Sequence, residues 1–127
     1  MLYTKEAKGS VDEVCGKVEA ATVAQKFGVL GSIDLKAKMN AKGVSFGPEC
    51  RVLEVCSPTH AKRALEAAMA ISTVLPCRIA IYQEDGKVKV TMLKPTVLLD
   101  LFGRADMRPL AVEVEGIMQR IIDAACA

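Results

Sequence analysis

The chain has 127 residues, of which 51% are hydrophobic and 25% are charged, and its formal net charge at pH 7 is +2. This length and composition predict a single packed domain over residues 1–127 and exclude a disordered chain. The balanced charge, without a basic stripe, indicates no nucleic-acid partner, and no apolar window is long enough to cross a bilayer, which indicates no membrane partner.

The first two predicted elements are a strand and a helix. Residues 2–8 mix β-forming residues with charges and predict a short strand at a sheet edge, which Gly9 ends. Ser10 and Glu13 then form a capping-box pattern at the start of a helix. Apolar residues follow at helical spacing, and we expect this helix to end near Gly28, which would be its left-handed cap.

The middle of the chain predicts two strands separated by a short helix. Residues 29–33 are the second strand candidate, and Asp34 can cap a lysine-rich helix over residues 35–42. Residues 44–48 end in a Gly-Pro turn signal and predict a loop. Residues 50–56 alternate with a period of two, which predicts the third strand.

A helix and a hairpin are expected next. Ser57 is a favourable N-cap, and Pro58 occupies the first helical position, where its missing N–H costs nothing. Small apolar residues along this helix allow close packing against a sheet. Pro76 separates the helix from a fourth strand over residues 77–82, and Asp85-Gly86 predicts a tight hairpin turn into the fifth strand.

The last predicted elements are that fifth strand, residues 87–92, and two helices over residues 96–102 and 109–125. Strands do not alternate regularly with long helices along the chain. This order therefore predicts an α+β fold class, with a sheet of about five strands and helices packed mostly on one face.

Two spaced motifs resemble a known family. The motif residues are Glu54-Val55-Cys56, Pro58, Ala61, Leu65, Leu75-Pro76-Cys77-Arg78-Ile79, Tyr82 and Gly86-Lys87. With them the chain resembles the domain-of-unknown-function family 302 over nearly its whole length. The resemblance implies a curved, mainly antiparallel sheet of the TATA-box-binding-protein-like or helix-grip type, and a homodimer. It supplies no established catalytic residues.

The junction between the third strand and its helix is the best site candidate. Cys56 would lie just before the N-cap, where free N–H groups and the helix dipole favour a thiolate. His60, the only histidine, falls in the first helical turn, and a neutral imidazole can bind a metal or accept a proton. Cys77 opens the next strand and would approach Cys56 if both strand ends meet at one edge. Arg78 and Arg51 could hold an anion, or form a surface salt bridge with Glu54 or Glu84.

Three interpretations of this cluster stay open. In the structural one, the cysteines fill a tight junction, and His60 caps the helix or faces solvent. In the second, the chain is a thiol-dependent redox or sulfur-transfer protein, with Cys56 as nucleophile and Cys77 as resolving partner. In the third, Cys56, His60 and Cys77 hold a soft metal or a haem, although their spacing matches no standard structural zinc pattern.

The sequence as a whole favours a small cytoplasmic domain that binds a small molecule or a partner, with His60 and Arg78 as ligand-binding candidates, over an enzyme. The odd number of cysteines, without a Cys-x-x-Cys pair or a signal-peptide pattern, indicates reduced thiols in the cytoplasm. No Gly-rich phosphate loop, His-Glu-x-x-His or Gly-x-Ser-x-Gly motif occurs. A conventional Ser-His-Asp or Cys-His-Asn enzyme would depend entirely on His60. The sequence identifies neither the ligand nor a cofactor.

Overall fold

Five strands form one antiparallel sheet in the order β1-β5-β4-β3-β2 in the computed structural model, which describes residues 1–127. The strands are β1 (Leu2–Ala7), β2 (Gly28–Asp34), β3 (Cys50–Cys56), β4 (Cys77–Glu84) and β5 (Lys87–Leu93). The first strand lies at a sheet edge, as its mixed apolar and charged sequence predicted. The sheet and the helices packed on it confirm the α+β class.

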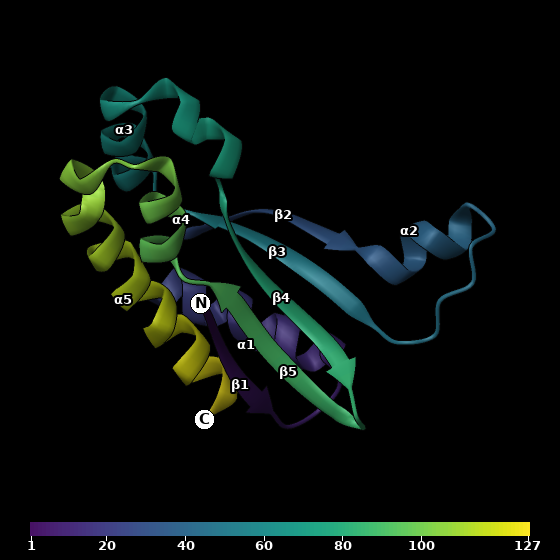
Figure 1. Cartoon of the computed structure of the whole chain (residues 1–127). Helices are drawn as coiled ribbons and strands as arrows, with labels where there is room; N and C mark the ends of the chain where they lie inside the picture. Colours follow the sequence, from purple (N-terminus) through teal and green to yellow (C-terminus); the bar gives the residue numbers. More distant parts are fainter.

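The helices occupy three places around this sheet (Figure 1). They are α1 (Val11–Ala24), α2 (Leu35–Ala41), α3 (Pro58–Ala67), α4 (Pro95–Phe102), α5 (Arg108–Cys126) and the short 3₁₀ helices η1 (Met69–Val74) and η2 (Ala105–Met107). Helices α1 and α5 pack against each other and against the sheet, α3, η1 and α4 gather at one end of it, and α2 lies at the tip of a long arm formed with β2 and β3. No helix is both long enough and apolar enough to span a membrane.

Two helix caps and one hairpin turn lie where the sequence predicted them. The Ser10 hydroxyl accepts the backbone N–H of Glu13 at 3.1 Å, and the Glu13 carboxylate accepts the Ser10 N–H, which completes the capping box. The Asp34 carboxylate caps α2 by accepting a backbone N–H at 2.9 Å. Asp85-Gly86 turns the β4–β5 hairpin with φ values of 54° and 73°, the left-handed geometry that such turns require.

The predicted end of α1 is wrong. The helix ends at Ala24, and Gly28 is the first residue of β2 instead of a left-handed cap. Lys26 takes the left-handed conformation, with a φ of 62°, and Phe27 donates its N–H to the Thr22 carbonyl at 3.0 Å. This is a Schellman ending with a lysine in the usual glycine position. It turns the chain early enough for Phe27 to enter the core, where it is 6% exposed.

Two apolar clusters hold the fold together. The larger lies between α1, α5 and the sheet face that carries Leu53, Val55, Ile79, Ile81 and Val90, all of them 0% exposed. The smaller joins α3, η1, α4, η2 and α5 through Ala64, Ile71, Leu99, Met107 and Ala111. The helices of the smaller cluster cover one end of the sheet. The two clusters therefore meet where β3 ends and β4 begins.

Candidate functional site

An apolar pocket lies at this junction, between the ends of β3 and β4 and helices α3, α4 and α5. It is lined by 18 residues, of which 15 are hydrophobic. The lining consists of Phe27, Val55, Cys56, Ser57, His60, Ala61, Ala64, Ile71, Val74, Leu75, Cys77, Pro95, Leu98, Leu99, Met107, Leu110, Ala111 and Val114. The cavity among these side chains has a volume of about 70 Å³, which is small for a ligand pocket. Its shape and lining fit a slender apolar group.

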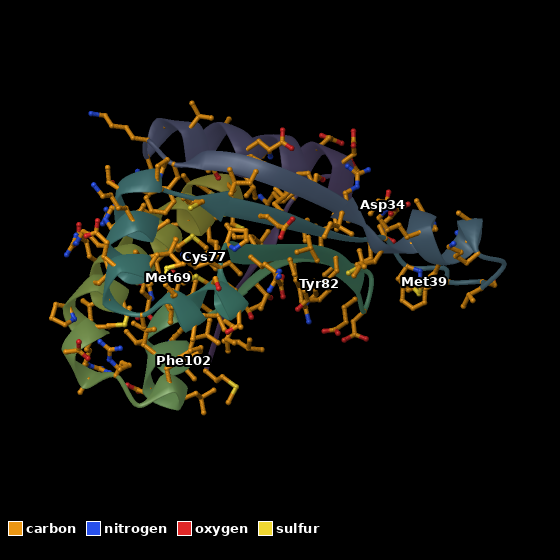
Figure 2. The ribbon with its side chains drawn as sticks, turned by 90° about the horizontal axis from the view of Figure 1, so that it is seen from above. Asp34, Met39, Met69, Cys77, Tyr82 and Phe102 are labelled. Atoms are coloured by element: carbon orange, nitrogen blue, oxygen red, sulfur yellow. The ribbon has the colours of Figure 1, made fainter.

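The antiparallel pairing of β3 with β4 brings Cys56 and Cys77 into the same pocket wall. Val55 lies opposite Cys77 in the register, so the end of β3 and the start of β4 meet at one edge of the sheet. Figure 2 shows Cys77 between the helical end of the molecule and the sheet, far from Asp34 on the arm. No disulfide joins these cysteines, because all five thiols of the chain are free.

Burial controls the acidity of both thiols. It raises the pKa of Cys56, and it raises the pKa of Cys77 to about 11, where a negative charge on Cys56 adds a smaller upward effect. This direction is opposite to the one expected for a thiolate at a helix N-terminus. The cause is the loss of hydration among apolar side chains, and both thiols are protonated at neutral pH.

His60 lies at the polar side of the pocket and uses both ring nitrogens. Its Nδ1 is 2.7 Å from the Ser57 hydroxyl, and its Nε2 is 2.9 Å from a carboxylate oxygen of Glu113 in α5. The other Glu113 oxygen accepts a hydrogen bond from Arg63 at 3.2 Å. The hydrogen bonds from His60 and then Arg63 lower the pKa of Glu113. The ring centroids of His60 and Phe27 are 5.7 Å apart, so the imidazole packs against the pocket wall.

The side chain of Ser57 differs from its expected role. The residue occupies the N-cap position of α3, but its hydroxyl makes no hydrogen bond to the first-turn N–H groups. It contacts His60 instead, and it also lies 3.1 Å from the Thr59 hydroxyl. The sequence did not indicate this chain of polar groups, because Glu113 is 53 residues from His60 and lies on another helix.

The remaining candidates are arranged less favourably for a metal or an anion. No group of three His, Cys, Asp or Glu side chains is placed to hold a metal ion, and His60 has no free nitrogen. Arg78 does not line the apolar pocket. Its Nε lies 3.9 Å from a carboxylate oxygen of Glu54, as in the surface salt bridge that the sequence offered as the alternative to an anion site.

Comparisons with known proteins agree with this fold. The model of the family described as "Domain of unknown function DUF302" matches residues 3–125. The crystal structure of an uncharacterized conserved DUF302 protein from Bacillus stearothermophilus is similar, with 29% sequence identity and a TM-score of 0.94 over 99% of this chain and 98% of that one. The comparison with curated proteins found no match.

Proposed function

This chain belongs to the DUF302 family, and we propose that it acts as a single small-molecule-binding domain whose ligand occupies the apolar pocket. The observation that carries the proposal is the composition of the pocket wall, where 15 of 18 residues are hydrophobic. Apart from Pro95, the others are Ser57 and His60, which lie together at one side.

This distribution indicates the chemistry of the ligand. An apolar chain that enters the pocket leaves water, which favours binding by about 25 cal/mol for each Å² of apolar surface buried. The Ser57 hydroxyl, at the polar side of the pocket, can hydrogen-bond one polar group at the end of that chain. The small volume of the cavity favours an unbranched ligand, and we therefore expect a slender apolar molecule with a single polar end.

Calorimetric titration with 1-octanol and with octanoate tests the proposal. The matched variants are Ala61→Phe, which fills the pocket, and Ala67→Phe, which adds the same ring to an exposed position of the same helix. We expect Ala61→Phe to weaken binding at least about 10-fold while Ala67→Phe leaves it unchanged, with a negative heat-capacity change on binding. Absence of binding to the parent protein, or equal binding by both variants, would contradict the proposal.

We further propose that the protein is a homodimer, with the arm formed by β2, β3 and α2, and the loop that follows α2, as the contact region. The arm extends away from the rest of the molecule (Figure 1). Its apolar side chains Leu30, Val44 and Phe46 are 66%, 56% and 39% exposed, and such groups are favourable to cover. Sedimentation equilibrium of the parent and of Phe46→Ser tests this, since a monomeric parent protein would contradict it.

The five free cysteines support a cytoplasmic location.

A thiol-dependent redox or sulfur-transfer function is the second candidate, because Cys56 and Cys77 share one pocket wall. The raised pKa of each thiol opposes it. Titration of the native protein with a thiol reagent at neutral pH separates the cases, since unreactive Cys56 and Cys77 would exclude this function. The soft-metal or haem interpretation through Cys56, His60 and Cys77 is tested by metal analysis and a visible spectrum of the purified protein.

A further inference from the structure

We infer from the polar side of the pocket that the protein hydrolyses small apolar esters, with Ser57 as nucleophile, His60 as general base and Glu113 as the residue that positions His60. The inference deepens the proposed function, because the apolar pocket would hold the acyl chain of the ester. It rests on the arrangement of three side chains from two elements that are far apart in the sequence.

The distances are those of an activated nucleophile. The Ser57 hydroxyl oxygen is 2.7 Å from Nδ1 of His60, and Nε2 of the same ring is 2.9 Å from the Glu113 carboxylate. Nucleophile, base and carboxylate each lie within hydrogen-bond reach of the next, the relation that defines a hydrolytic triad independently of fold or chain order. In the usual Ser-His-Asp triad Nε2 faces the serine, whereas here Nδ1 of His60 faces Ser57 and Nε2 faces Glu113.

The hydrogen bonds also fix the proton positions in the neutral ring. An ionised carboxylate only accepts hydrogen bonds, so the Nε2 of His60 that faces Glu113 must carry the ring proton. Nδ1 is then an acceptor, and the Ser57 O–H must donate to it. Arg63 holds the second oxygen of Glu113 and favours its ionised form. The ring is therefore set to remove the serine proton.

The surroundings suit an ester with an apolar acyl group. Ser57 is 7% exposed and, with His60, is one of the residues that line the pocket where the acyl chain would lie. The backbone N–H groups of Thr59 and His60, in the first turn of α3, have no hydrogen-bond partner within the chain. They lie two and three residues after Ser57 and can stabilise the oxyanion that forms on attack.

The reaction balances with water as the only co-reactant. The Ser57 oxygen bonds to the ester carbonyl carbon while its proton moves to Nδ1 of His60. The C–O bond to the alcohol then breaks, and the alcohol leaves with that proton. Water attacks the acyl-serine, again giving a proton to His60, and the acid leaves as the proton returns to Ser57. Cys56 does not compete in this chemistry at neutral pH, since its thiol is protonated.

Labelling with an alkyl fluorophosphonate tests the nucleophile directly, because attack by an activated serine expels fluoride and leaves a stable phosphonyl-serine. Native protein is labelled, digested and mapped by mass spectrometry, and p-nitrophenyl butyrate hydrolysis is measured in parallel. The control variant is Ser45→Ala, in an exposed loop. We expect the adduct on Ser57, loss of labelling and of hydrolysis in Ser57→Ala, and unchanged behaviour in the control.

The other two residues have separate readouts. His60→Gln should slow hydrolysis by about 10²- to 10⁴-fold, the range for loss of a general base. Glu113→Gln should lower kcat without changing KM, because Glu113 orients His60 and does not line the pocket. A thermal melt of each variant identifies any that does not fold.

The outcomes separate this inference from the proposed function. An unlabelled Ser57 in native protein that still binds 1-octanol would overturn the hydrolase inference and leave the binding proposal intact. Hydrolysis by folded Ser57→Ala at the parent rate would also overturn it. If Ser57→Ala does not fold, the labelling site in the parent protein decides alone. Failure to bind 1-octanol contradicts the binding proposal. If Ser57 is nevertheless labelled, the result supports a reactive Ser57 without an apolar binding site.

Discussion

Replacing Leu99 or Ile81 by alanine compares the stability contributed by a side chain in the pocket wall with that of a side chain in the closed core. Leu99 lines the pocket and is 9% exposed, whereas Ile81 is 0% exposed among the packed side chains between the sheet and helices α1 and α5. Leu99→Ala and Ile81→Ala each remove three carbon atoms. The chemistry of the change is therefore matched, and the difference in stability reports on the space around each side chain.

The expected magnitudes follow from what surrounds each site. Losing three buried carbons costs about 2.4 kcal/mol in transfer free energy at either position. Ile81→Ala should cost more, about 4 kcal/mol, because a new cavity adds about 24 cal/mol per Å³ where neighbours cannot collapse. Leu99 already borders empty space on one side, so its neighbours lose fewer contacts. We expect Leu99→Ala to cost about 2.5 kcal/mol.

Urea unfolding followed by far-ultraviolet circular dichroism measures both values. With a denaturant slope of about 2 kcal/mol/M, the Leu99→Ala midpoint should fall by about 1.2 M and the Ile81→Ala midpoint by about 2 M. Leu99→Ala should also admit branched alcohols that the parent pocket excludes. A cost for Leu99→Ala equal to or above that of Ile81→Ala would refute the reasoning, because it would show that the space beside Leu99 is filled in solution.

Three further predictions concern backbone geometry, acid stability and thiol reactivity. Gly16→Ala, in a helix with nothing within 4 Å of the added methyl group, should raise the free energy of unfolding by about 0.5–1 kcal/mol. Gly86→Ala, at a φ of 73°, should lower the free energy of unfolding by about 1 kcal/mol. The urea midpoints of the two variants should therefore move in opposite directions, and a shift in the same direction would contradict the reasoning. The hydrogen bond from His60 lowers the pKa of Glu113 below its ordinary value of 4.5, so its stabilisation is present above pH 4.5 and disappears as the pH falls through the native pKa. Glu113→Gln should therefore be less stable than the parent at pH 6, and this deficit should be smaller at pH 3 in urea titrations. An equal deficit at both pH values would contradict this. A pKa of about 11 in place of 9 leaves Cys77 with about 100-fold less thiolate at pH 8. Cys77 should therefore react with a thiol reagent at least about 100-fold more slowly in the native protein than in 8 M urea. Equal reaction rates in the two states would contradict this prediction.

Short-range chemistry in the sequence was sufficient to locate most elements. The Ser10–Glu13 capping box, the Asp34 cap and the Asp85-Gly86 turn each depend on groups within a few residues of one another, so their hydrogen bonds can be inferred from spacing. The end of α1 could not be inferred in this way. Its position depends on Phe27 entering a core that distant strands build, and that demand outweighs the preference for glycine at a left-handed residue.

The candidate site shows the same division. The sequence by itself indicated that the junction from Cys56 to His60 was distinctive, because a strand end, a helix start and two reactive side chains coincide there. Its chemistry depends on contacts between residues that are far apart in the chain. Packing among apolar helices removes water from Cys56 and raises the pKa of its thiol, and α5 brings Glu113 to His60 from 53 residues away. Desolvation and long-range pairing depend on which distant surfaces meet, and no local pattern in the sequence contains that information.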